Sequence, residues 1–206
     1  RQALAQIHHA LFGLARPRTA PGEAPRLAIP AAATPYLPPP AHVKSHGAGR
    51  FELLATAFEL PTGAAWSASP HGPLFAYHLH QHEYLRCADV PPVVRAQVIA
   101  DWILSHRSGI GWDPHPTGLR LLAWGKLLTT PGMLPEDEAS RSALLRSFAD
   151  QAETLSANLE LRLQANHLLS NLLCVVAAGM WVDGAASAGW RECSERLREE
   201  LASQIH

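Results

Sequence analysis

Hydrophobic residues recur at every third or fourth position through most of the second half of the chain, which is the spacing of one helix face. Helices are expected where this spacing holds, over residues 91–107, 117–128, 135–160, 161–182 and 185–205. Asp183 and Gly184 form a turn signal between the last two. Because no segment alternates with period two over more than a few residues, we predict an all-α chain of antiparallel helices joined by short turns.

The segment between residues 50 and 90 is less regular. The stretch RFELLATAFELP (residues 50–61) fits either a strand pair or a short helix, and both interpretations stay open. The stretch GPLFAYHLHQHEYLRCAD (residues 72–89) is expected to be helical through its second half.

The first fifty residues differ from the rest. Residues 1–15 have helical spacing and predict an N-terminal helix. Residues 16–49 are rich in proline, which removes backbone donors and disfavours helices and central strands, so this segment is expected to be an extended connector. Residues 50–206 form the remaining domain. The chain begins without Met and its end continues a helical pattern without a cap, so we interpret it as a piece of a longer protein.

One helical segment carries an unusual set of polar residues. With about 100° between successive residues, residues 160–182 divide into an apolar and a polar side. The apolar side holds Leu161, Ala165, Leu168, Leu169, Leu172, Val175, Val176 and Met180. The polar side holds Glu160, Gln164, Asn166, His167, Ser170, Asn171 and Cys174. Amides and an imidazole, where a solvent-facing stripe would carry Lys, Glu and Arg, indicate a partly dry site; alternatively, they satisfy the backbone of neighbouring helices.

Composition narrows the expected partners. The formal net charge is −1, so no global field would attract nucleic acid or an anionic membrane surface. Three cysteines without a CxxC spacing are too few for a disulfide framework. The longest apolar run, residues 172–182, is shorter than the about 20 residues that span a bilayer. Neither nucleic acid nor a membrane is therefore expected as a partner.

The segment ANLELRLQANHLLSNLLCVVAAGMW (residues 157–181) resembles the most characteristic stretch of the heparinase II/III-like polysaccharide lyases, in which an Asn-His pair stands on an inner helix of an α/α toroid. Two earlier segments resemble other stretches of the family in the same order: PLFAYHLHQHEYL (residues 73–85) and GWDPHPTGLRLLAWGKLL (residues 111–128). The resemblance covers roughly residues 51–205. There are departures, because Gln81 and His82 stand where the family has aromatic residues and Glu83 replaces a common Asp.

The resemblance implies an incomplete (α/α) toroid of antiparallel helix pairs over residues 50–206. The rest of the toroid, a catalytic Tyr and a β-sandwich domain would follow residue 206, so this chain alone is expected to be inactive. The resemblance implies no cofactor. It also implies a bacterial periplasmic or secreted protein, although this chain carries no signal peptide.

The implied reaction is β-elimination of a uronic-acid polysaccharide, which removes the proton at C5 and expels the glycosidic oxygen at C4. The ionised carboxylate disfavours the developing carbanion, so donors aimed at it stabilise the transition state. By resemblance, Asn166 and His167 are the catalytic residues that neutralise this acid. Tyr77 and Tyr84 are not assigned to proton transfer, which falls to the Tyr expected beyond residue 206.

Five further residues are candidates for binding the acidic polysaccharide: His80, Tyr84, Trp112, Arg120 and Asn171. Trp112 offers a flat face to a sugar, or it packs in the core. Arg120 pairs with a substrate carboxylate, or it forms an ion pair on a helix surface. His80 and Tyr84 line the groove, or they anchor the structure. Asn171 is expected to support the orientation of His167 one turn away.

Two other functions compete with the lyase. His78, His80 and His82 alternate and would share one face of a strand, beside Glu83, as a metal site would require. The other competitor is a non-catalytic glycan-binding or exopolysaccharide-biosynthesis protein on the same scaffold, because a fold alone does not determine function.

Overall fold

The computed structural model describes the chain apart from residues 1–23, 30–37, 48, 69, 161–165 and 206. The expected N-terminal helix over residues 1–15 and much of the connector over residues 16–49 lie outside the described residues. The described part contains six α-helices: α2 (Gly72–Gln81), α3 (Pro92–Ser105), α4 (Pro114–Thr129), α5 (Glu138–Ala157), α6 (Asn166–Trp181) and α7 (Ser187–Ile205).

Two small antiparallel sheets accompany the helices. The larger one has the order β2-β3-β4, and its strands are Val43–Ser45, Arg50–Leu53 and Thr56–Glu59. The smaller one pairs β1 (Arg26–Leu27) with β5 (Val182–Asp183). The mostly helical class is therefore confirmed, whereas a purely α architecture is not.

The open interpretation of residues 50–61 resolves as a strand pair, β3 and β4. Leu53 pairs with Thr56, so the connecting turn consists of Leu54 and Ala55. Both turn residues have positive φ, 52° and 59°. Such two-residue turns usually carry Asn and Gly, which tolerate positive φ. Leu-Ala is no signal for this turn, which is why the sequence left the segment undecided.

The helix expected in the second half of residues 72–89 lies in the first half. α2 ends at Gln81, and His82 follows in the left-handed backbone region with φ 58°. Glu83–Arg86 then form a short 3-10 helix, η2. His82 is fully buried, and its Nδ1 accepts a hydrogen bond from the indole of Trp124 at 3.0 Å. This tertiary contact accompanies a backbone conformation that is uncommon for residues other than glycine.

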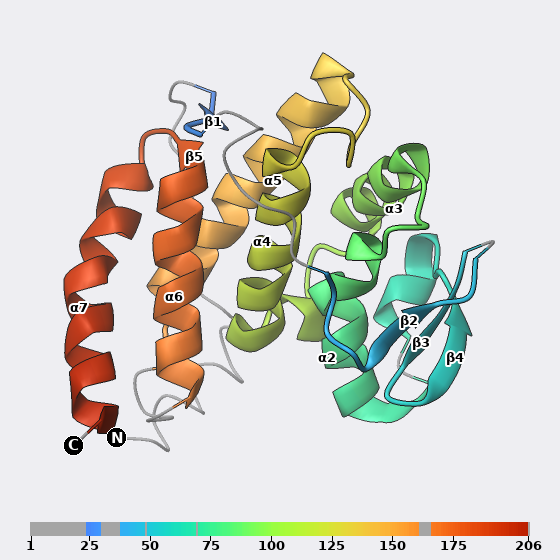
Figure 1. Cartoon of the computed structure of the whole chain (residues 1–206), viewed down its shortest axis with the longest axis horizontal. Coiled ribbons are helices and arrows are strands. Elements are labelled where there is room, and N and C mark those ends of the chain that lie inside the picture. The colour runs from blue at the N-terminus through green and yellow to red at the C-terminus, as the bar shows by residue number, and fades with distance from the viewer. Residues whose placement is uncertain (1–23, 30–37, 48, 69, 161–165, 206) are drawn as a thin grey trace.

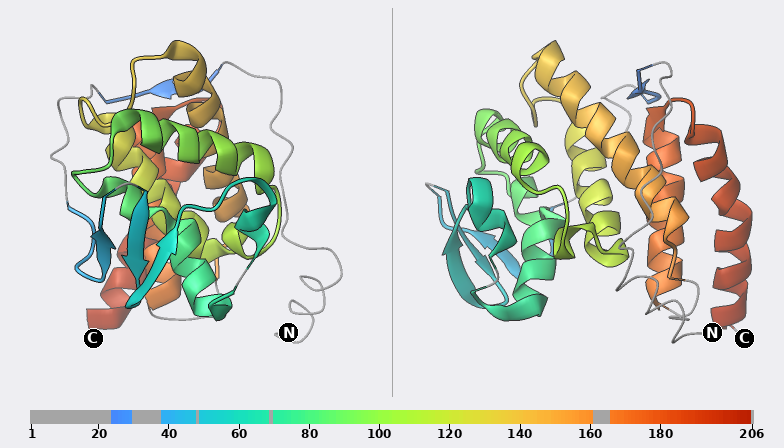
Figure 2. Two further views of the ribbon diagram at one scale, coloured as in Figure 1. Left: turned by 90° about the vertical axis from the view of Figure 1, so that its right-hand side faces the viewer. Right: turned by 180° about the vertical axis from the view of Figure 1, so that it is seen from behind.

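The helices lie side by side (Figure 1), from α7 at one edge through α6, α4 and α5 to α2 and α3. The three-stranded sheet covers the opposite edge, as the view from behind also shows (Figure 2). Aromatic rings join this sheet to α2 and η2. The ring of Phe58 lies 5.5 Å from that of Phe75, and the ring of Phe51 lies 5.1 Å from that of Tyr84.

α4 and α6 run parallel and approach each other at two glycines of α4. A Cβ atom at Gly118 would lie 3.1 Å from the Sγ of Cys174, and one at Gly125 would lie 2.0 Å from the ring of Trp181. Gly125 follows Gly118 by seven residues, and Trp181 follows Cys174 by seven residues. The two helices therefore run in the same direction, and their first turns lie at the same end of the molecule.

The polar and apolar sides of α6 differ from the predicted division. Leu168 and Leu172 are buried as expected. Asn171 and Cys174, predicted on the polar side, are also buried, and Met180, predicted on the apolar side, is 56% exposed. The reason is that α4 packs against the Cys174 side of the helix. The predicted polar side is therefore open only near the start of α6.

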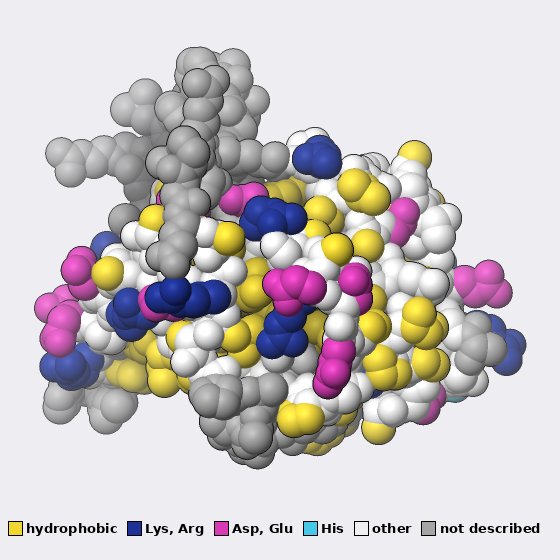
Figure 3. Space-filling model, turned by 90° about the horizontal axis from the view of Figure 1, so that it is seen from above, with side chains coloured by type: hydrophobic (Ala, Val, Ile, Leu, Met, Phe, Trp, Pro, Cys, Tyr) yellow, Lys and Arg dark blue, Asp and Glu magenta, His cyan; other side chains and the backbone are white. Residues whose placement is uncertain are grey.

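None of the described helices is both long and apolar enough to cross a bilayer. On the face shown in Figure 3, side chains of both charge signs lie interspersed among apolar ones. This mixing agrees with the formal net charge of −1.

Candidate functional site

Polar side chains from α2, α4 and α6 meet where α4 and α6 begin. Asn166 and His167 form the first turn of α6, and both are exposed. His115 lies in the first turn of α4, and its ring is 5.4 Å from the ring of His167. We call this group the α4–α6 corner; its members are Tyr77, Asp113, His115, Glu160, Asn166, His167 and Asn171.

Glu160 links His167 to the buried part of α6. Its Oε2 accepts a hydrogen bond from the Nδ2 of Asn171 at 2.9 Å and lies 3.5 Å from the Nδ1 of His167. Asn171 is 1% exposed, whereas the side chain of His167 is 49% exposed. One carboxylate oxygen therefore connects a fixed amide with an accessible imidazole.

A second polar pair, Tyr77 and Asp113, borders the corner on the α2 side. The hydroxyl of Tyr77 donates to the Oδ2 of Asp113 at 2.7 Å, and Asp113 is the N-cap residue of α4. Burial and this hydrogen bond raise the pKa of Tyr77, so its hydroxyl stays protonated. Burial and the neighbouring His167 lower the pKa of His115, which is therefore neutral at physiological pH.

The corner presents donors at its α6 end and both a donor and an acceptor at its α2 end. At α6, the amide of Asn166 and the imidazole of His167 provide side-chain donors. Asp113 and Tyr77 offer an acceptor and a donor to neutral hydroxyls.

Three predicted binding residues lie in the interior instead of at a groove. His80, Tyr84 and Arg120 are each 0% exposed. The Nδ1 of His80 accepts a hydrogen bond from the indole of Trp102 at 3.1 Å. For His80 and Tyr84 the structure thus shows the anchoring role that was the alternative to substrate contact.

Arg120 connects four elements of the interior. Its guanidinium donates to the backbone oxygens of His80 (2.8 Å) and Gly111 (2.7 Å) and to the Oε1 of Gln151 (2.6 Å). It also lies 4.0 Å above the ring of Trp102. Both expectations for Arg120, the substrate contact and the surface ion pair, are therefore wrong. Its contacts tie α4 to α2, α5 and the 3-10 helix η3 (Ile110–Trp112), which leads directly into Asp113.

Trp112 and Asn171 are held by the protein itself. The partly buried ring of Trp112 stacks on Trp102 at 5.7 Å, and its indole donates to the backbone oxygen of His106 at 2.9 Å. Core packing, the alternative for Trp112, accounts for these contacts. Asn171 is too buried to touch a polysaccharide, and its amide donates to Glu160.

The three alternating histidines do not share a face. The ring of His78 meets that of His42 at 5.1 Å, whereas the Nδ1 atoms of His80 and His82 accept indole N–H groups of buried tryptophans. The metal site would require the three histidines on one strand, but His78 and His80 lie in the helix α2 and His82 follows its end. Among the described residues, no group of three or more His, Cys, Asp or Glu side chains is placed to hold a metal ion.

The sequence did not indicate Asp113 or His115 as site residues, and it placed Glu160 on the polar side of residues 160–182 without giving it a role. All three lie within the stretches that carry the family resemblance. The available signal was the Asp-Pro-His-Pro run of residues 113–116, because Asp followed by Pro is typical of a helix start. That signal places Asp113 and His115 in a first turn. It does not show that the first turn of α6 is their neighbour.

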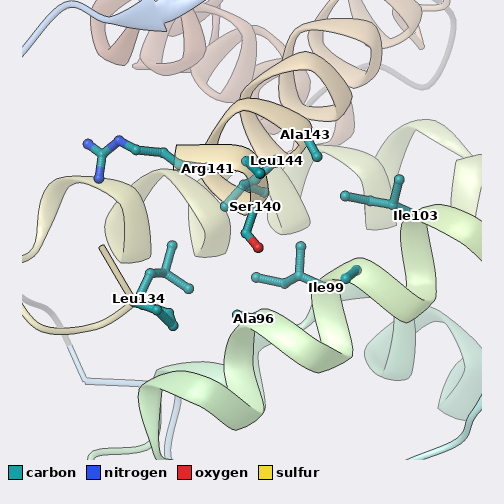
Figure 4. Close-up of a pocket in the computed structure, with 11 residues that line it drawn as sticks. Ala96, Ile99, Ile103, Leu134, Ser140, Arg141, Ala143 and Leu144 are labelled. Carbon is teal, nitrogen blue, oxygen red and sulfur yellow. The ribbon is translucent and has the colours of Figure 1, made fainter. Parts of the chain in front are cut away.

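A cavity of about 260 Å³ lies away from the corner, between α3 and α5. Figure 4 shows Ile99 and Ile103 of α3 facing Leu144 of α5 across it. The hydroxyl of Ser140 points toward this space, while Arg141 extends away from it (Figure 4). Such a lining suits an apolar group and offers little to a charged sugar.

No family model, curated protein or solved structure matches the chain. The likeness to the lyase family therefore depends on the sequence segments themselves, and any function has to be inferred from the geometry of the corner.

Proposed function

We propose that this chain is part of a heparinase II/III-like polysaccharide lyase in which Asn166 and His167 neutralise the carboxylate of a uronic acid. The supporting observation is that both side chains are exposed in the first turn of α6. Adjacent helical residues point about 100° apart, so the pair can flank one carboxylate. A pair enclosed in the core would have been unable to meet a polymer.

The chemistry explains why donors are needed at this place. A base removes the C5 proton, the electron pair of that bond forms the C4–C5 double bond, and the C4–O bond breaks toward the leaving sugar, which takes up a proton. Negative charge builds on the C6 carboxylate in the transition state. The amide of Asn166 and a protonated His167 donate to its oxygens and stabilise that charge.

Proton transfer is assigned by resemblance to a Tyr beyond residue 206. The hydroxyl of Tyr77 is engaged by Asp113, whose negative charge opposes formation of a phenolate. Tyr77 and Asp113 fit the binding of sugar hydroxyls better than the transfer of a proton.

For the architecture, we propose that residues 50–206 form part of an (α/α) toroid. α6 and α7 are joined by a short turn and pack closely, because a Cβ at Gly179 would lie 3.1 Å from the Cβ of Trp190. The side-by-side order of the helices (Figure 1) is compatible with stacked helix pairs. By resemblance, further helices and a β-sandwich domain would complete the fold.

A second candidate is a non-catalytic protein that binds glycans or serves exopolysaccharide biosynthesis. It is favoured by the contacts and burial of the two tyrosines in the described part of the chain. Tyr77 is hydrogen-bonded to Asp113, and Tyr84 is fully buried. The corner as described can thus bind an acidic sugar without itself providing a tyrosine for proton transfer.

The test is a lyase assay on the protein at its natural full length. It follows the ultraviolet absorbance of unsaturated uronate ends on a panel of heparan sulfate, alginate and bacterial exopolysaccharides. Asn166→Ala and His167→Ala are each expected to lower kcat/KM by about 100-fold or more, the usual effect of losing one transition-state donor.

The matched controls are Gln97→Ala, an exposed amide on α3, and His46→Ala, an exposed imidazole in the loop after β2. Both are expected to keep the wild-type rate, because neither belongs to the corner. Unchanged kcat/KM in Asn166→Ala and His167→Ala would refute the assigned roles. Binding of a polysaccharide by the wild type without any absorbance would favour the glycan-binding candidate.

A further inference from the structure

We propose that Glu160 is a positioning residue that keeps a proton on the Nδ1 of His167 and thereby directs the Nε2 of this imidazole toward substrate. The inference deepens the proposed function and rests on it for its catalytic consequence. The arrangement of Glu160, His167 and Asn171 itself is independent of the reaction.

The first support is that two side chains, those of Asn171 and His167, contact the same oxygen atom of Glu160. The Oε2 of Glu160 receives the Nδ2 hydrogen of Asn171 at 2.9 Å and faces the Nδ1 of His167 at 3.5 Å. An ionised carboxylate only accepts hydrogen bonds, so the nitrogen that faces it favourably is the one that carries hydrogen. In a neutral imidazole this leaves Nε2 as the unprotonated atom.

The second support is that the carboxylate is itself held in place. Asn171 lies in the middle of α6 and is 1% exposed, so its amide is fixed by the packed helix. The side chain of Glu160 is only 19% exposed, compared with 49% for His167. A carboxylate anchored to the helix core can therefore orient the more exposed ring of His167.

His115 limits the ring of His167 from the α4 side. The two ring centroids are 5.4 Å apart with an interplanar angle of 50°. His115 lies between Pro114 and Pro116 in the first turn of α4, where φ of both neighbours is restricted by their rings. His167 thus has Glu160 at its Nδ1 and His115 beside its ring.

The consequence concerns how His167 can neutralise a uronate. With Nδ1–H directed at Glu160, the neutral ring presents only an Nε2 lone pair, which repels a carboxylate. Only the imidazolium donates from Nε2, and the carboxylate of Glu160 attracts the positive charge of that ring at Nδ1. Asn166 donates in either case, so the loss of Glu160 weakens the contribution of His167 and leaves that of Asn166.

The first experiment measures the tautomer directly. Imidazole ¹⁵N shifts of the intact protein are recorded at a pH where His167 is neutral. We expect the Nδ1–H tautomer in the wild type and in Glu160→Gln, whose amide oxygen still accepts from Nδ1. We expect a change toward the Nε2–H tautomer, which a free histidine side chain prefers, in Glu160→Ala.

A matched control is available in another His–Glu pair. The Nε2 of His46 lies 3.3 Å from the Oε2 of Glu52. Glu52→Ala is expected to change the signals of His46 and to leave those of His167 as they are. An Nε2–H tautomer of His167 in the wild type, or an unchanged tautomer in a folded Glu160→Ala, would overturn the proposal.

The second experiment links the tautomer to activity. Glu160→Gln keeps the ring orientation but removes the charge, so it should raise KM for the polysaccharide about 10-fold or more. Glu160→Ala should in addition lower kcat, while a circular dichroism spectrum like that of the wild type shows that both variants fold. Wild-type kcat and KM in both variants would contradict the positioning role. Absence of any lyase activity in the wild type, with the expected tautomers, would refute the proposed function alone.

Discussion

At the scale of single residues, the interior of this protein is unusual for the polar groups it encloses. A guanidinium and two imidazoles, from Arg120, His80 and His82, are almost completely shielded from water. Their partners are neutral: backbone and amide oxygens for Arg120, and indole N–H groups for the two histidines. Buried polar groups without partners are costly, and the Nε2 atoms of His80 and His82 are buried without a hydrogen-bond partner. Arg120, whose hydrogen bonds join several elements, serves the stability of the scaffold behind the corner.

Replacing Arg120 with Met should test this role. The variant leaves the backbone oxygens of His80 and Gly111 without their donor, and the loss of charged hydrogen bonds in the interior costs about 3 kcal/mol in the free energy of unfolding. Urea unfolding measures the change. Arg107→Ala, at an exposed arginine, is the control and should stay within about 0.5 kcal/mol of wild type. Equal stability of the two variants would contradict the structural role.

The buried histidines predict a dependence of stability on pH. Burial, with the charges of His106 and Arg120, lowers the pKa of His80 to about 2. Burial likewise lowers the pKa of His82 well below its ordinary value of 6.5. Below about pH 6.5 the unfolded chain binds protons at both positions and the folded chain does not, so stability is complete above that pH and falls as the pH decreases.

The expected slope from these two groups is about 2.7 kcal/mol per pH unit once the unfolded histidines are fully protonated. Urea unfolding between neutral pH and about pH 5 measures it, above the range in which most carboxylates titrate. His46→Ala removes an exposed imidazole and should leave the slope unchanged. Stability that stays level over this interval would show that His80 and His82 are protonated in the folded state.

At the scale of elements, the distance between α4 and α6 decides whether the corner exists. His115 and His167 meet only because two parallel helices touch at Gly118 and Gly125. A side chain at either glycine would push the helices apart and separate their first turns. The glycines therefore matter to the site although neither belongs to it.

Gly125→Ala tests this packing. The new Cβ would lie 2.0 Å from the ring of Trp181, so the helices must move, which typically costs 1–3 kcal/mol. Gly189→Ala in α7 is the control, because a Cβ there meets nothing within 4 Å and should stabilise the helix by up to about 1 kcal/mol. Thermal unfolding compares the two. A melting temperature of Gly125→Ala at or above that of Gly189→Ala would contradict the close contact.

At the scale of the whole molecule, the corner and the apolar cavity lie on different elements. The corner belongs to α2, α4 and α6, whereas the cavity lies between α3 and α5. Arg120 joins the two regions indirectly, since its contacts reach α2, η3 and α5 from α4. An interior cross-linked in this way holds the elements that carry the corner in one geometry.

The sequence by itself determined the helices, because hydrophobic spacing reports which face of each segment is buried. It also directed attention to Asn166 and His167, whose types are unusual beside so many leucines. It did not determine the turn at Leu54 and Ala55, whose residue types are unusual at positive φ, or the end of α2 at His82, whose side chain contacts the distant Trp124. Only the tertiary structure placed Arg120, His80 and Tyr84 inside and Glu160, His115 and Tyr77 around His167. The physical reason is that periodicity describes one helix at a time, whereas a site is made by the distances between several.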